Sequence, residues 1–298
     1  MLPEKPPLTL SQQVELLENR GLIIKDKKYA ENFLSLVNYY HFSGYSLSFE
    51  KERHKFIPGT TFEQVVKLLE FDSKLRQEVF KYLGIIEIVI RTKSAYYFSH
   101  SFNDPFAHEK HINFRTNELK YKLWIEELHT TTKKSKEIFI DHFRKKYQEK
   151  FPAVYIWVAV ELMSFGLLSR FIEYMHIKEQ KLIADDFKIP PSVLVSWLKT
   201  FCYIRNICAH HSRLWNRQLS ISPSLPKSDR WKNINSRLFG YILYIINHMI
   251  FFIGNDYYKE WQISIESLID NHPEVPNFWK SIGLLENWKE NSLWRGEI

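Results

Sequence analysis

The chain has 298 residues with 9 glycines, 2 cysteines and a formal net charge of +7 at pH 7. The two cysteines, Cys202 and Cys208, exclude a disulfide scaffold, and the N-terminus lacks the apolar run of a secretory signal, so we expect a cytoplasmic protein. The positive charge favours a polyanionic partner. The sequence contains no P-loop, G-x-G-x-x-G, H-E-x-x-H or G-x-S-x-G motif, so the enzyme classes that use them have no support.

Few glycines and long periodic apolar runs predict an all-α protein. We expect an N-terminal helical segment over residues 1–59, a helical bundle over 60–256 and a C-terminal helical extension over 257–298, packed as one unit.

The first 59 residues show two helix starts. Thr9 is expected to cap a short helix that stops at Gly21, and Asp26 to cap a second helix that runs on into Tyr39–Tyr45. Ser43-Gly44 predicts a break within that second helix. Residues 51–55 predict a hairpin-like loop.

A long helix is expected to follow, because Thr60 and Glu63 form a capping box and an apolar stripe continues to about Phe98. Residues 99–117 predict a loop. Further helices are expected at 118–130, at 135–149, from Pro152 to about His176, from Pro190-Pro191 into the stretch beginning at Phe201, and at about 232–253.

The stretch from Phe201 to Asn216 is chemically unusual because it places Arg205, Asn206, His210 and His211 within seven residues. Arginine suits phosphate recognition, and histidine gives or takes a proton near neutral pH. Cutting RNA requires a group that deprotonates the 2′-hydroxyl, one that protonates the leaving oxygen, and a cation for the phosphorane charge. The alternative interpretation is a buried polar network that ties helices together.

Geometry limits how this stretch could act. On an ideal helix Arg205 and His210 lie roughly 140° apart. They therefore converge only if the helix bends or ends there, or if a second copy supplies the partner groups.

Arg205-Asn206-x-x-Ala209-His210-His211 resembles the R-x4–6-H motif of HEPN-domain ribonucleases. The bare spacing also occurs from Arg170 to His176, so the surrounding blocks carry the specificity. Those blocks, in order along the chain, resemble the AbiD/AbiF-like abortive-infection proteins of that superfamily. They are Asn38-Tyr-Tyr-x-x-Ser-Gly-Tyr45, Ile86-Glu-x-x-x-Arg91 and Trp157-x-x-x-Glu161-x-x-Ser-Phe-Gly166.

The resemblance implies a HEPN-like bundle and a metal-independent endoribonuclease, without a cofactor, that acts in phage defence or as a toxin. His210 would be the acid/base, Arg205 the phosphate clamp and Asn206 a support, whereas His211 is a second acid/base, a backbone support or simply exposed. HEPN sites are typically composite, so we expect a homodimer. RNA is the expected substrate, and a structured non-coding RNA is a candidate regulator. The rival hypothesis is a HEPN-like scaffold that binds RNA or protein without cutting.

Other residues are open to two interpretations each. Glu161 either pairs with Arg205 or Arg91 to support the site or lies on the solvent side of its helix. Candidate RNA-binding residues could equally be packing tyrosines and a solvated basic surface. They are Tyr39, Tyr40, Lys133, Lys134, Arg144, Lys145, Lys146 and Arg213.

Two further possibilities receive little support from the sequence. Cys202, Cys208 and the two adjacent histidines do not have a usual zinc spacing, so no metal site is predicted. Residues 238–253 are very apolar but short for a membrane span and contain Asn247 and His248. We predict a core helix there and no membrane partner, although a membrane-acting effector is a third hypothesis.

Overall fold

The computed structural model describes residues 6–232, 234 and 237–297. Within these residues helices dominate, and the strands are limited to the hairpin of β1 (Glu50–Glu52) and β2 (Lys55–Phe56). The predicted all-α fold class and the predicted hairpin are therefore confirmed.

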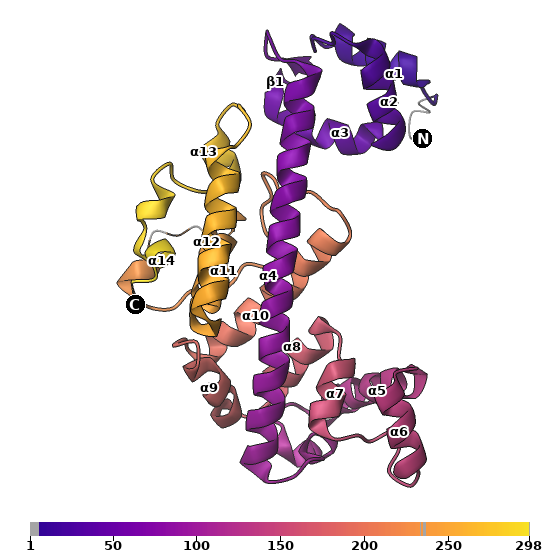
Figure 1. The fold of residues 1–298 in the computed structure, drawn as a ribbon, viewed down its shortest axis with the longest axis vertical. Coiled ribbons are helices and arrows are strands. Elements are labelled where there is room, and N and C mark those ends of the chain that lie inside the picture. Colours follow the sequence, from indigo (N-terminus) through magenta and orange to yellow (C-terminus); the bar gives the residue numbers. More distant parts are fainter. Residues whose placement is uncertain (1–5, 233, 235–236, 298) are drawn as a thin grey trace.

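One long helix, α4 (Phe62–Phe102, 41 residues), runs through the length of the molecule, and the other elements pack along it (Figure 1). The predicted apolar stripe is buried at Val65, Leu75 and Val79. The capping box lies one residue later than predicted. Thr61 Oγ1 accepts the backbone N–H of Gln64 at 3.3 Å, whereas the side chain of Thr60 donates to the carbonyl of Ile57.

The N-terminal helices α1 (Leu10–Asn19), α2 (Lys27–Leu36) and α3 (Tyr39–Ser46) lie at the beginning of α4, at the top of Figure 1. Thr9 and Asp26 cap α1 and α2 as predicted. The predicted break at Ser43-Gly44 is wrong, because α3 continues through it. The break falls earlier, where the side chain of Asn38 caps α3 and separates it from α2.

The other end of α4 carries the elements from residue 107 to residue 174 (Figure 1). The predicted single helix from Pro152 to His176 is wrong. Its chain is extended at Met163, and Ser164 starts a new helix by accepting the backbone N–H of Leu167 at 3.2 Å. The elements here are the 3-10 turns η2 (Ala107–Glu109) and η3 (His111–Asn113), then α5 (Glu118–Lys134), α6 (Ile138–Lys146), α7 (Ile156–Leu162) and α8 (Phe165–Tyr174).

The last third of the chain returns along α4. Its elements are α9 (Ile177–Asp185), α10 (Pro191–Ala209), η4 (Asp229–Trp231), α11 (Gly240–Ile253), α12 (Asn255–Asp270), α13 (Phe278–Ile282), η5 (Trp288–Glu290) and α14 (Ser292–Arg295). Helix α10 packs against α4, α8 and α9, and α11 and α12 lie beside α4 and against each other (Figure 1). The predicted N-terminal and C-terminal segments thus both contact α4, and the boundaries at residues 59 and 256 stay predictions.

The predicted core helix corresponds to α11, which is buried over most of its length. Both polar residues in it have partners: Asn247 donates to the carbonyls of Leu293 and Trp294 at 2.9 Å, and His248 Nε2 lies 2.8 Å from the carbonyl of Phe187. In the part of the chain that the structure describes, no helix combines the length and the apolar character needed to cross a bilayer.

Candidate functional site where helix α10 ends

The Arg205–His211 motif lies at the C-terminal end of helix α10, at the protein surface. Pro191 occupies the first turn of this helix, where a missing N–H costs nothing. Its apolar residues recur at helical spacing and are buried at Val193, Trp197 and Phe201. In the last turn Ile207 and Cys208 are still buried on this face, whereas Asn206 is exposed on the other.

The helix ends within the motif. His210 is the C-cap residue, and His211 has a left-handed backbone with φ of 53°. The N–H of His211 donates to the carbonyl of Cys208 at 3.1 Å, and the N–H of Ser212 donates to that of Ile207 at 2.9 Å. These two bonds form a Schellman motif, whose left-handed position is usually glycine. A histidine there costs about 1 kcal/mol or more in backbone strain.

The side chains of the motif are reachable from solvent. Asn206, His210 and His211 are exposed, and Arg205 is half-buried. The Arg205 guanidinium carbon lies 5.7 Å from the centre of the Phe80 ring on α4. A network sealed between helices therefore does not describe this end of α10.

Arg213, a predicted RNA-binding residue, lies in the same region. Its guanidinium carbon is 6.0 Å from the centre of the Tyr45 ring on α3. A side chain at Gly44 would begin 3.5 Å from an Arg213 nitrogen, an ordinary van der Waals distance, so Arg213 lies against this part of α3. The structure thus brings Arg213 together with the Asn38–Tyr45 block.

A buried carboxylate on α4 holds the segment that follows the motif. Asp72 is fully buried, pairs with Arg76 and accepts the Tyr45 hydroxyl at 2.6 Å. It also accepts the backbone N–H groups of Leu214 at 3.2 Å and Trp215 at 2.7 Å. Burial raises the pKa of the Asp72 carboxyl, although the Arg76 charge and these hydrogen bonds act in the opposite direction. The network joins α3, α4 and the chain after α10.

His41 on α3 is a titratable group near the motif that sequence reasoning missed. Its ring centre lies 5.4 Å from that of Tyr45. Burial lowers the pKa of His41, and the charge of Arg76 and the neighbouring Arg213 and His211 lower it further. The signal available in the sequence was its place one turn before Tyr45 in the tyrosine-rich block.

A pocket opens between α4 and the end of α10. It has a volume of about 360 Å³, and we call it the Phe80 pocket. Cys208 in its wall is a thiol whose pKa is raised by burial to about 12, so it is protonated at neutral pH. The lining residues are Ser73, Arg76, Gln77, Phe80, Cys208, Ala209 and His211.

The predicted basic RNA-binding residues on α5 and α6 lie away from the motif. These helices lie at the C-terminal end of α4 (Figure 1), whereas the motif lies beside Arg76 and Phe80, nearer the middle of that helix. Lys133, Lys134, Lys145 and Lys146 are exposed there. Arg144 pairs with Asp141 and its guanidinium reaches the carbonyl of Lys133 at 3.3 Å, so it ties α6 to the end of α5.

Glu161 does not pair with Arg205 or Arg91, as one of its two interpretations required. It is exposed on α7. Within the described residues Arg91 bonds Glu87 and the carbonyl of Val160, and Arg205 lies over Phe80. The solvent-facing interpretation is therefore the correct one, because the neighbouring apolar residues of α7 occupy the core side.

The two tyrosines that begin α3 differ. Tyr40 is 86% exposed, so its ring is available for stacking on a base. The Tyr39 hydroxyl accepts a hydrogen bond from Arg20 at 2.9 Å and its ring packs against the core. The packing interpretation thus fits Tyr39, and RNA binding stays a prediction for Tyr40.

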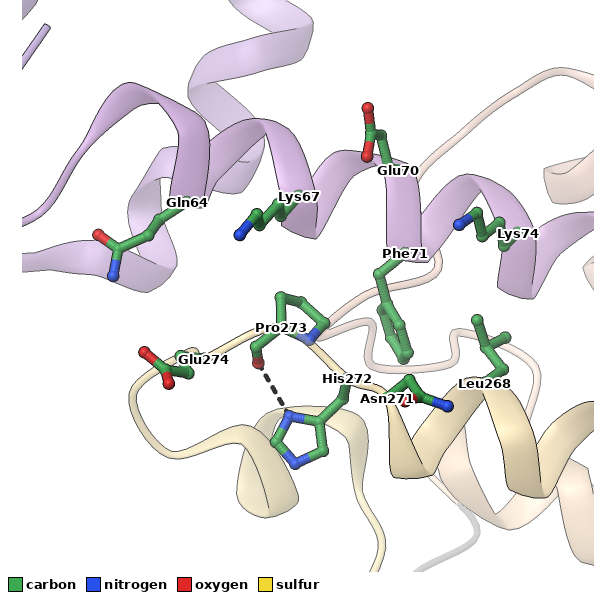
Figure 2. A pocket seen from close by; sticks show the side chains of 10 residues that line it. All are labelled: Gln64, Lys67, Glu70, Phe71, Lys74, Leu268, Asn271, His272, Pro273 and Glu274. Atoms are coloured by element: carbon green, nitrogen blue, oxygen red, sulfur yellow. Dashed lines mark hydrogen bonds between the residues drawn. The ribbon is translucent and has the colours of Figure 1, made fainter. Parts of the chain in front are cut away.

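A larger pocket, of about 450 Å³, lies between the first turns of α4 and the end of α12 (Figure 2). Phe71 points into it between the two elements, and His272 Nδ1 lies 2.8 Å from the carbonyl of Pro273. Lys67 and Lys74 line it together with Glu70 and Glu274, so its charge is mixed. None of its lining residues belongs to the motif.

The chain was compared with known protein families, curated proteins and solved structures. The family model described as Abi-like protein matches residues 32–216, which cover α3, α4 and the whole of α10 with the motif. No curated protein and no solved structure matches the chain.

Proposed function

Because the chain belongs to the Abi-like protein family, which points to abortive infection and phage defence, we propose that it is a metal-independent endoribonuclease of the HEPN type. The observation that carries the proposal is the exposed end of α10, where His210 and His211 follow within two turns of Arg205. A cation and imidazoles at a solvent-reachable helix end suit the transfer of protons around a phosphodiester. In this proposal the protein acts as a toxin or defence effector.

The reaction would proceed without a covalent intermediate. His210 takes the proton of the 2′-hydroxyl, the 2′-oxygen attacks phosphorus and the bond from phosphorus to the 5′-oxygen breaks. His211 supplies the proton to that oxygen, Arg205 holds the charge of the phosphorane, and Asn206 keeps His210 in place. The products are a 2′,3′-cyclic phosphate and a 5′-hydroxyl.

Cleavage of labelled RNA in EDTA by the purified protein tests this proposal. Arg205→Ala and His210→Ala should each lower the rate at least about 100-fold, because each removes a group that acts in the transition state. The matched controls are Arg170→Ala and His176→Ala, another pair that fits the R-x4–6-H pattern. Arg170 pairs with Glu127 and His176 begins α9, so these two variants should cleave normally.

A homodimer with two facing motifs is the second part of the proposal. The ends of α10 are exposed in the single chain, so a second copy can reach them. If Arg205 of one copy works with His210 of the other, mixing the two inactive variants restores part of the cleavage. Wild-type protein that is monomeric and fully active would refute this part alone.

The rival is a scaffold that binds RNA or protein without cutting. The half-buried arginines of the motif region and the exposed lysines of α5 and α6 would suit it too. Binding of RNA with no cleavage in EDTA or with added divalent metal would favour the scaffold. Copurification of a structured RNA would support a regulatory RNA in either case.

A further inference from the structure

The Phe80 pocket adjoins the proposed cleavage site. His211 lines both, whereas Arg205, Asn206 and His210 do not line the pocket. Phe80 is 42% exposed although it is a large apolar ring. It projects from the same face of α4 as Ser73, Arg76 and Gln77, which recur at helical spacing. Cys208 and Ala209 add apolar surface beside the ring, so the pocket combines an apolar wall with a few polar groups, as ligand-binding pockets do.

The neighbours of Phe80 indicate the class of ligand. The Arg205 guanidinium, a flat cation, lies 5.7 Å from the ring centre. Arg76 is only 6% exposed, and the amide of Gln77 offers both a donor and an acceptor. A flat, aromatic and polar-edged group fits such walls, because it can stack on the ring and on a guanidinium and form hydrogen bonds at its edge.

We propose that the Phe80 pocket binds one nucleobase of single-stranded RNA, next to the phosphate that the motif cleaves. This inference rests on the proposed ribonuclease function and adds the substrate contact. The base stacks against Phe80, and its backbone then passes Arg205 and His211. Unpaired RNA is required, since a base within a duplex cannot turn into a pocket.

Binding of a probe that cannot be cut separates base recognition from catalysis. Fluorescein-labelled 2′-O-methyl decamers of uridine and of adenosine lack the attacking hydroxyl, so wild-type protein can be used in fluorescence anisotropy. Phe80→Leu should weaken binding by about 5- to 150-fold, the range for loss of one base–aromatic stack. Phe80→Trp keeps an aromatic ring and should bind as tightly as wild-type protein. Tyr257→Leu is the matched control, because Tyr257 is similarly exposed at 46% but lies on α12.

A decamer of abasic spacers keeps the phosphates and removes every base. Wild-type protein and Phe80→Leu should bind it equally, because only the base contacts Phe80. If Phe80→Leu binds the uridine and adenosine decamers as tightly as wild-type protein does, the pocket assignment is overturned. A Phe80→Leu defect that persists on the abasic probe would overturn it too, since Phe80 would then act by supporting Arg205.

Cleavage provides a separate readout for the proposed function. Unmodified decamers are incubated with the same proteins in EDTA. Cleavage by wild-type protein together with unchanged binding by Phe80→Leu would refute the pocket and leave the nuclease intact. Base-dependent binding without any cleavage would refute the nuclease and leave the pocket as a base-binding site.

Discussion

The carboxylate of Asp72 accepts the backbone N–H of Trp215 at 2.7 Å, although the two residues are 143 positions apart in the chain. Asp72 is part of the long helix α4, and Trp215 lies just beyond the motif. The Trp215 indole also donates to the Ser48 hydroxyl at 2.8 Å. The end of α10 is thus positioned by polar contacts from two other parts of the chain.

Replacement of Asp72 by asparagine should strongly destabilise the protein. Asp72 is fully buried, and the change leaves the Arg76 guanidinium without its counter-charge, which costs about 3–5 kcal/mol for a buried pair. Urea unfolding measures the loss. Asp185→Asn is the control: Asp185 also pairs with a residue four positions away, Lys181, but both are exposed, so the loss should stay below about 0.5 kcal/mol. Equal losses in both variants would contradict the role of Asp72.

Sequence patterns predicted the helices better than their contacts. Thr9 and Asp26 cap helices as expected, because a cap depends on residues three positions away. The prediction failed where two threonines compete for the cap position. Thr60 and Thr61 both precede a suitable partner, and the Thr60 hydroxyl is used instead by the turn before the helix, where it donates to the carbonyl of Ile57. Ser164 was missed because the apolar run on both sides of it concealed the cap.

The candidate site, too, could be predicted from the sequence only in its local features. Arg205, His210 and the end of the helix near them were predicted from residue types and spacing. Asp72, Arg76 and Phe80 were not, because a residue on a helix gives no sign of which distant segment it meets. Their spacing of four residues along one face of α4 was the available signal.

His211 offers a test of whether function accounts for its backbone strain. His211→Gly should raise the free energy of unfolding by about 1 kcal/mol, since glycine adopts the left-handed conformation without strain. The same change should lower RNA cleavage if His211 is a proton donor. Thermal unfolding and cleavage rates measure the two effects.

His54 provides the matched control for that change. It has φ of 68° in the exposed turn of the β1–β2 hairpin, away from the motif. His54→Gly should therefore stabilise the protein by a similar amount and leave cleavage unchanged. If His211→Gly stabilises without slowing cleavage, the histidine is dispensable for the reaction.

The basic surface of α5 and α6 is expected to bind the RNA backbone. Alanine at four exposed lysines there should weaken RNA binding and flatten its dependence on salt, by about 0.7 in slope for each single-strand phosphate that is no longer neutralised. Anisotropy at several salt concentrations measures the slope. The residues changed are Lys133, Lys134, Lys145 and Lys146.

A control for these lysines must remove the same charge elsewhere. Four exposed lysines on other elements serve, and their replacement by alanine should change the slope less. If both sets flatten the slope equally, the attraction comes from net charge alone and α5–α6 has no special part in it. The control residues are Lys25, Lys28, Lys178 and Lys227.

His248 should make the fold sensitive to mild acid. It is 7% exposed, its Nε2–H donates to the carbonyl of Phe187, and burial lowers its pKa from 6.5 to about 4. Between these two values the unfolded chain binds a proton that the folded protein does not, so stability falls as the pH falls. The full loss is at most about 3 kcal/mol and is complete below pH 4.

His248→Gln isolates this contribution, because glutamine can donate to the same carbonyl and does not titrate. Urea unfolding at pH 7, 5 and 4 should show wild-type protein losing more stability than the variant across this range. His142→Gln, a change at an exposed histidine on α6, should follow the wild type. Parallel curves for wild type and His248→Gln would mean that His248 is protonated in the folded protein. In that case the hydrogen bond to Phe187 outweighs the cost of burying the charge.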